Sequence, residues 1–127
     1  MWIEALENPR ALEMFDREPS LEAATLTKLL IDRDGPTVTI SMQIRDYPSD
    51  PPARWRMHQH NAVMIEVQAM GVEDVSIAGW STDNKVSILV ERLPGRIRIQ
   101  ASGEGTDIEI RCGWLRIAGV TPYCRVA

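Results

Sequence analysis

Two histidines separated by one residue are the most direct candidates for chemistry in this chain of 127 residues. In an extended segment, the spacing of His58 and His60 puts both imidazole rings on one side, where they could ligate a transition metal. A metal site needs a third ligand, and the spacing fixes none, although Asp46 and Asp50 lie upstream. We therefore expect no metal site and interpret both histidines as exposed loop residues.

Three other groups of residues have types that could serve a reaction. Cys112 could be a nucleophile, but its place in a strand beside Trp114 favours a buried thiol. Asp32 and Asp34 could form a carboxylate pair for acid–base catalysis, but the glycine that follows them is typical of a charged turn. The Gly-Glu-Gly segment at residues 103–105 resembles part of a phosphate loop, yet no helix follows it, so it predicts a hairpin turn. The sequence thus predicts no catalytic residue and no cofactor.

Negative charge is concentrated at the N-terminus. Residues 1–34 contain eight acidic and four basic side chains, a difference that equals the formal net charge of −4 for the whole chain. A nucleic-acid partner would favour a basic excess instead, so none is expected. An acidic face favours a basic protein partner, and the candidate contact residues within it are Glu4, Glu7, Glu13 and Asp16. The alternative interpretation is an ordinary solvated surface.

An Arg-Trp-Arg element follows a proline-rich stretch at residues 47–52, which predicts a stiff, extended loop. Trp and Arg are enriched among the residues that dominate protein interfaces. Arg54, Trp55 and Arg56 are therefore further candidates for partner contact. The alternative is that Trp55 folds back and closes the open end of the sheet. Two other tryptophans, at positions 80 and 114, adjoin strands and are expected in the core or at its rim.

Strict alternation of polar and apolar residues is the strongest structural signal. From Thr37 to Arg45 every odd position is polar and every even position is apolar, and the same period of two returns at residues 96–100 and 107–111. Short turns separate these and further apolar runs, with no helix available for a crossover. The pattern predicts a mostly β fold of about seven to eight antiparallel strands, in two layers or a strongly bent meander.

The chain is expected to form a single domain. Residues 1–20 predict a short helical cap, residues 21–119 the antiparallel strands, and residues 120–127 a C-terminal tail. The apolar stripe of the cap consists of Trp2, Leu6, Leu12 and Phe15. Near Lys28 the apolar phase of the first strand slips by one residue, which predicts a β-bulge.

One hairpin can be given a register from the sequence. A four-residue loop at 102–105 would place Ile99 opposite Ile108 and Arg98 opposite Glu109. The isoleucines would then stack on the core face, while the arginine and the glutamate would meet on the outer face.

Nothing in the composition indicates a membrane or an export signal. No apolar run approaches the ~20 residues of a membrane helix. Acidic and basic residues interrupt the N-terminus where a signal peptide has its apolar core. We therefore expect a cytoplasmic protein, in which Cys112 and Cys124 remain two buried free thiols.

Several turn, aromatic and strand residues share the order and spacing of one known family. They are Trp2, Asn8-Pro9, Phe15, Pro19-Ser20-Leu21, the run from Ile31 to Ile40, Pro51-Pro52 with Trp55, and Ile77-Ala78-Gly79-Trp80. The set resembles the immunity protein 50 family of bacterial polymorphic toxin systems. The resemblance implies a mostly β fold and a protein that protects the producing cell by binding and blocking a cognate toxin. It offers no catalytic residues.

Two other functional classes stay open from the sequence. A ligand-binding or scaffolding β domain would hold a deep apolar cavity of roughly 300 Å³ or more between its sheets. A small metal-dependent enzyme would use His58, His60 and nearby acids.

Overall fold

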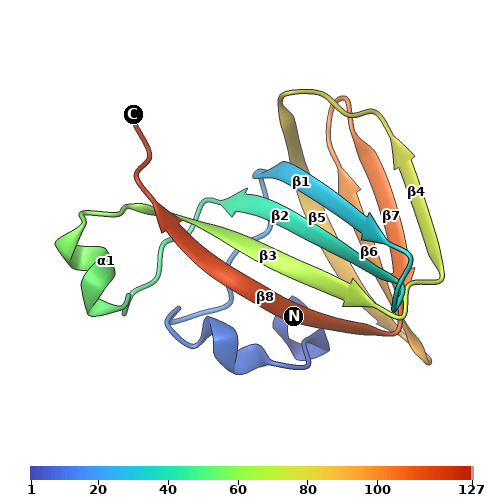
Figure 1. The fold of residues 1–127 in the computed structure, drawn as a ribbon, viewed down its shortest axis with the longest axis horizontal. Coiled ribbons are helices and arrows are strands. Elements are labelled where there is room, and N and C mark those ends of the chain that lie inside the picture. The colour runs from blue at the N-terminus through green and yellow to red at the C-terminus, as the bar shows by residue number, and fades with distance from the viewer. Residues whose placement is uncertain (127) are drawn as a thin grey trace.

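The chain folds into a mostly β structure, as the alternation predicts (Figure 1). The computed structural model describes residues 1–126, so Ala127, the end of the expected tail, lies outside the described residues. Within them, eight antiparallel strands form one sheet in the order β4-β7-β6-β5-β1-β2-β3-β8. In chain order the elements are η1 (Trp2–Ala5), η2 (Pro9–Leu12), β1 (Ala24–Asp32), β2 (Thr37–Ile44), α1 (Ala53–Met57), β3 (Ala62–Met70), β4 (Asp74–Ala78), β5 (Asn84–Leu93), β6 (Arg96–Ser102), β7 (Asp107–Cys112) and β8 (Trp114–Tyr123).

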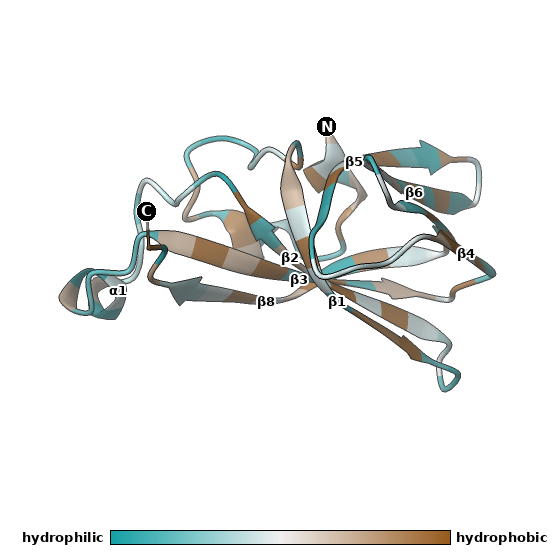
Figure 2. Cartoon of the chain, turned by 90° about the horizontal axis from the view of Figure 1, so that it is seen from above, coloured by the Kyte–Doolittle hydropathy of each residue, from teal (hydrophilic) through white to brown (hydrophobic). Residues whose placement is uncertain are grey.

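The sheet is bent into two halves, β1-β2-β3-β8 and β4-β7-β6-β5, which diverge from a short joint (Figures 1 and 2). Only residues 24–26 of β1 pair with residues 84–86 of β5. Apolar side chains from both halves and from the N-terminal segment meet in one buried cluster. The predicted stripe of the cap belongs to this cluster, since Trp2, Leu6, Leu12 and Phe15 are all buried. The bend therefore creates a two-sided core that the N-terminal turns help to close.

The order of the strands in the sheet agrees only in part with their order in the sequence. The runs β1-β2-β3 and β5-β6-β7 are made of consecutive neighbours, as the short turns predict. A meander in which each strand pairs with the next does not extend through the whole sheet, because β4 leaves β3 to pair with β7, and β8 returns to pair with β3. The bulge in β1 is confirmed, since its register against β2 shifts between Leu26 and Lys28.

The last strand is longer than the sequence indicates. β8 continues to Tyr123 and so extends into the segment at 120–127 that we expected to be a tail. Its final residues pair with the start of β3, with Val120 opposite Ile65 and Pro122 opposite Val63. Proline is compatible with this position because β8 is the edge strand of the sheet.

The hairpin of β6 and β7 has a different register from the one expected. Its loop is residues 103–106, so Ile99 lies opposite Ile110 rather than Ile108. The expected pairing of Ile99 with Ile108, and of Arg98 directly with Glu109, is therefore wrong by two residues. A shift of two keeps every side chain on its face. The isoleucines accordingly lie in the core.

The ion pair expected on the outer face is present as a diagonal contact. The Arg98 Nε donates to Glu109 Oε1 at 2.8 Å, and the Arg98 Nη1 reaches Glu91 Oε1 at 3.1 Å. The loop position is fixed from outside the hairpin: Thr106 is buried, and its hydroxyl donates to the Asn84 Oδ1 at 3.2 Å.

An asparagine fastens the N-terminal segment to the edge of β8. The Asn8 Nδ2 donates to the Ile117 carbonyl at 2.9 Å, and the Asn8 Oδ1 accepts from the Ile117 N–H at 2.8 Å. Next to it, the Glu7 N–H donates to the Leu115 carbonyl at 2.8 Å. The segment thus continues the sheet beyond β8 and covers part of its edge.

Candidate partner-binding surface

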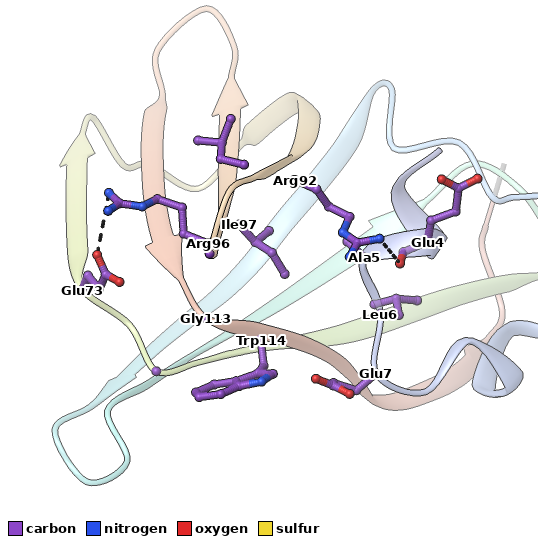
Figure 3. A pocket seen from close by; sticks show the side chains of 13 residues that line it. Glu4, Ala5, Leu6, Glu7, Glu73, Arg92, Arg96, Ile97, Gly113 and Trp114 are labelled. Atoms are coloured by element: carbon purple, nitrogen blue, oxygen red, sulfur yellow. Dashed lines mark hydrogen bonds and ion pairs between the residues drawn. The ribbon is translucent and has the colours of Figure 1, made fainter.

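The described surface has an open groove of ≈ 590 Å³ (Figure 3). Four chain segments form it: η1 with the residues after it, the turn between β5 and β6, the connection from β3 to β4, and the junction of β7 and β8. Two of the predicted contact residues, Glu4 and Glu7, line this groove. The acidic N-terminus therefore forms one wall of a concave surface.

Charges of both signs line the groove. Glu73 adds a third carboxylate, and the opposite wall carries Arg92 and Arg96. The Arg96 Nη1 lies 3.8 Å from the Glu73 Oε2, and the Arg92 Nη1 donates to the backbone carbonyl of Glu4 at 3.5 Å. The Arg92 contact uses the main chain and leaves the Glu4 carboxylate exposed, with its Oε2 3.8 Å from the N-terminal amino group of Met1.

An exposed tryptophan forms the floor of this groove. Trp114 is 55 % exposed, and in Figure 3 the carboxylate of Glu7 points toward the edge of its ring. The Trp114 ring lies over Gly71, where a Cβ would meet the ring at 2.7 Å, so a larger residue there would force the half-exposed ring to move. Trp80 is 46 % exposed. The expectation that both tryptophans lie in the core or at its rim is wrong, and Trp114 is a surface aromatic within the groove.

Sequence reasoning missed the groove residues contributed by the sheet, although one signal points to Trp114. In β8 the buried residues are Leu115 and Ile117, and period-two alternation then turns Trp114 outward. No comparable signal identifies Arg92 or Arg96, because their approach to the N-terminus depends on how the two halves of the sheet fold.

Glu13 lies in a second hollow, of ≈ 460 Å³, together with Arg10 and Asp50. Here the proline-rich loop docks on the N-terminal segment, since the Asp50 N–H donates to the Met14 carbonyl at 3.1 Å. The Arg56 Nη2 lies 3.5 Å from the Asp50 Oδ1. The structure therefore brings Glu13 and Arg56, predicted from distant parts of the sequence, to the same loop.

Asp16 lies in a third hollow, of ≈ 390 Å³, beside Arg17, Glu18 and Asp46. The Asp46 Oδ2 accepts from the backbone N–H of Ser20 at 2.8 Å. The four predicted acids are thus spread over three separate hollows along the N-terminal segment rather than gathered in one.

The Arg-Trp-Arg element, expected at the end of the proline-rich loop, lies within the short helix α1. Trp55 is 3 % exposed and packs against Tyr47, with ring centroids 6.4 Å apart. The structure thus agrees with the alternative in which Trp55 folds back. Arg54 and Arg56 lie on the exposed side of α1. Trp55 anchors the helix, and the two arginines are the groups it presents to solvent.

The two histidines stack on each other next to α1, with ring centroids 5.7 Å apart. His58 is exposed, whereas His60 is half-buried, and its Nδ1 makes no hydrogen bond. Within residues 1–126 no three His, Cys, Asp or Glu side chains are arranged to hold a metal ion. The pair offers a metal no more than two ligands.

The two cysteines differ in environment. Both are free thiols, as expected, but only Cys112 is buried. Cys124 is exposed, so the expectation of two buried thiols is wrong for this residue. Burial raises the pKa of the Cys112 thiol to about 11, which keeps it protonated at neutral pH and unreactive as a nucleophile.

The core itself has no room for a ligand in the part of the chain that is described. The apolar cavity between the two halves, among residues such as Trp2, Met42 and Leu115, holds only ≈ 10 Å³. A ligand-binding site of the kind considered from the sequence needs about 300 Å³. None of the helices in residues 1–126 has the length and apolar character to span a membrane.

The structure is therefore that of a small β protein with a filled core and open, charged surface hollows. A family model described as immunity protein 50 matches residues 8–123, and the chain belongs to this family. The match covers most of the chain and confirms the resemblance noted from its turn and aromatic residues. Comparisons with curated proteins and with solved structures found no match.

Proposed function

We propose that this chain is an immunity protein that binds a cognate bacterial toxin in the cytoplasm of the producing cell and blocks it by occlusion, without catalysis. Membership of the immunity protein 50 family carries this proposal. The filled core and the protonated, buried thiol of Cys112 agree with a role that depends on the surface rather than on a reaction.

The contact surface we propose runs along the N-terminal segment. It comprises Glu4 and Glu7 in the groove, Glu13 and Asp16 in the next two hollows, and Arg54 and Arg56 on α1, which Trp55 holds in place. Trp114 adds a half-exposed aromatic side chain to the groove, and large aromatics are frequent at the centres of interfaces.

Electrostatics explain why an acidic surface suits this role. A toxin that acts on nucleic acid needs a basic cleft to hold phosphates. An acidic surface can occupy such a cleft, accelerate the encounter and exclude the substrate. The N-terminal acids contribute the excess negative charge of this chain.

Co-expression with the toxin gene next to this gene tests the function directly. Cells that express the toxin alone should die, and cells that also express this chain should survive. If no neighbouring toxin is restrained in this assay, the proposed function is wrong.

Charge reversal tests the surface. The variant Glu4→Lys, Glu7→Lys, Glu13→Lys should lower the association rate constant for the toxin at low salt by about tenfold or more. The matched control reverses three exposed acids at the other end of the β5-β6-β7 half, and so makes the same change in net charge. They are Asp83, Glu104 and Asp107. Equal effects of the two variants would show that net charge, and not this surface, governs binding.

Removing the two exposed arginines of α1 probes the second part of the surface. Arg54→Ala with Arg56→Ala should raise the dissociation rate constant and leave the thermal stability unchanged, since neither side chain is buried. Trp55→Ala is unsuitable for this purpose because Trp55 is part of the core. Toxin binding unchanged in the double variant would remove α1 from the interface.

A further inference from the structure

The outer half of β1 has an open edge. β1 separates from β5 after Leu26, at the bulge, and the residues from Lys28 to Asp32 pair only with β2 in the described structure. In an antiparallel strand, alternate residues direct their N–H and C=O groups to opposite sides. Half of the backbone groups in this segment therefore face away from β2, toward a side that no strand of residues 1–126 occupies.

Between Lys28 and Asp32 the side chains on this edge are apolar. Leu30 is 50 % exposed and Ile31 is 56 % exposed, and they lie on opposite faces of the strand. Figure 2 shows the end of the β1–β2 hairpin extending away from β5 and β6, with β1 coloured as hydrophobic. An exposed apolar edge strand promotes pairing with another chain, and proteins normally protect such edges.

The strand on the other side of the split is covered, which makes the bare edge of β1 more notable. On β5 the Ile88 N–H donates to the Leu21 carbonyl at 3.1 Å, and Arg92 contacts the Glu4 carbonyl of η1. The N-terminal segment thus covers part of the edge of β5 and leaves that of β1 open.

We propose that this edge pairs with the same edge of a second copy of the chain, in an antiparallel register centred on Leu30. Lys28 then lies opposite Asp32 of the second copy, and Leu29 lies opposite Ile31 of the second copy. Because the contact is two-fold, each of these pairs occurs twice, and Leu30 lies opposite Leu30 of the second copy. The contact therefore has two opposite-charge pairs and three apolar pairs. A two-fold interface requires this kind of self-complementarity.

The charges select this register over its neighbours. In a two-fold pair of strands, the core-side faces of both copies lie on the same side of the joined sheet. The pairing can therefore shift only by two residues, because a shift of one would exchange the faces. Such a shift sets Leu30 opposite Lys28 in one direction and opposite Asp32 in the other. The register centred on Leu30 also continues the apolar inner face, because Leu29 and Ile31 adjoin the buried Ile40 and Val38 of β2.

A five-residue edge is small for an interface. Stable complexes bury about 1,200–2,000 Å² in total, and a short pair of strands buries less. The dimer is therefore expected to form with rising protein concentration rather than to be permanent. This assembly goes beyond the proposed toxin binding, because β1 lies outside the N-terminal surface assigned to the toxin.

Analytical ultracentrifugation over a range of protein concentrations tests the dimer. The mass of the parent protein should rise from 14.3 kDa toward twice that value. Lys28→Asp alone and Asp32→Lys alone place like charges opposite each other and should remain monomeric at concentrations where the parent dimerises. An equimolar mixture of the two single variants restores opposite charges at both pairs and should dimerise again, as should the double variant.

Ile77→Lys on the free edge of β4 is the matched control and should dimerise like the parent. A parent protein that stays monomeric at every concentration would overturn the proposal. So would single variants that dimerise normally, or a mixture that stays monomeric. Backbone amides of Lys28–Asp32 that become protected from hydrogen exchange only when toxin is bound would assign this edge to the toxin instead. Cell survival on co-expression reports the proposed function independently of all these results.

Discussion

Replacement of Asn8 by alanine tests whether one side chain holds the N-terminal segment, and with it the acidic surface, against the sheet. Both amide contacts of Asn8 with Ile117 are partly buried, at 2.9 and 2.8 Å. Alanine leaves the N–H and C=O of Ile117 without these partners. At about 1 kcal/mol per hydrogen bond, Asn8→Ala should lower the free energy of unfolding by about 2 kcal/mol. For a domain of this size the melting temperature should then fall by roughly 6 to 10 °C.

Asn61 offers a matched control, because it makes the same pair of contacts at the surface. Its Nδ2 donates to the Arg125 carbonyl at 3.2 Å, and its Oδ1 accepts from the Arg125 N–H at 2.6 Å. Both contacts are exposed, so water can replace the lost side chain. Asn61→Ala should therefore change the free energy of unfolding by no more than about 0.5 kcal/mol.

Urea unfolding measures the difference between the two variants, and native-state hydrogen exchange locates it. In Asn8→Ala the Ile117 amide should exchange faster than in the parent, whereas amides in the middle of β2 should change only through global unfolding. Equal stability losses for Asn8→Ala and Asn61→Ala, or an Ile117 amide that keeps its exchange rate, would refute the assignment of Asn8 as the fastening residue.

Three further outcomes follow from burial and charge. Ile99→Ala should lower the free energy of unfolding by about 2 to 5 kcal/mol, measured by chemical denaturation, because Ile99 is only 3 % exposed. Ellman's reagent should titrate one thiol per folded chain at neutral pH, Cys124, and a second, Cys112, only after denaturation. The hydrogen bond and charge of Arg98 hold the pKa of Glu109 below its ordinary 4.5, so the contact stabilises the fold above about pH 4.5 and is lost as pH falls through the lowered pKa. Arg98→Gln should accordingly lower the melting temperature at pH 7, and lower it by less as the pH falls through the lowered pKa of Glu109.

Where the alternation is strict, local pattern was sufficient to predict a strand and its buried face. The alternation in β2 placed Val38, Ile40, Met42 and Ile44 inside, and all four are buried. The slip near Lys28 was enough to predict the bulge. These features depend only on residues close in the sequence. The period of two between side chains on the same face of a strand is a local property of extended backbone.

Strand order and hairpin register could not be predicted in the same way, because contacts distant in the sequence decide them. The loop between β6 and β7 lies one residue later than expected because Thr106 is buried and bonded to Asn84. Gly119 and Pro122 interrupt the pattern that predicts strands, yet β8 passes through both because β3 offers a partner along its whole length. Helix α1 was missed for a related reason: five residues are too few for periodicity, and the burial of Trp55 holds them in place.

The candidate surface shows the same division between local and tertiary information. Charge counting identified the N-terminal acids, but Asn8 and Pro9 separate the two short turns, so Glu4 and Glu7 face one hollow while Glu13 faces another. At ~0.15 M salt, exposed charges more than about 8 Å apart are largely screened from each other. All the acids therefore contribute to long-range attraction at low salt, whereas close contacts with a partner depend on whichever hollow it enters. Association rate constants should consequently depend on the total acidic charge of the segment. Dissociation rate constants should depend on the contacts that the partner makes in one particular hollow. Single charge reversals at positions 4, 7 and 13 can therefore show which hollow the partner enters, even where the triple reversal cannot.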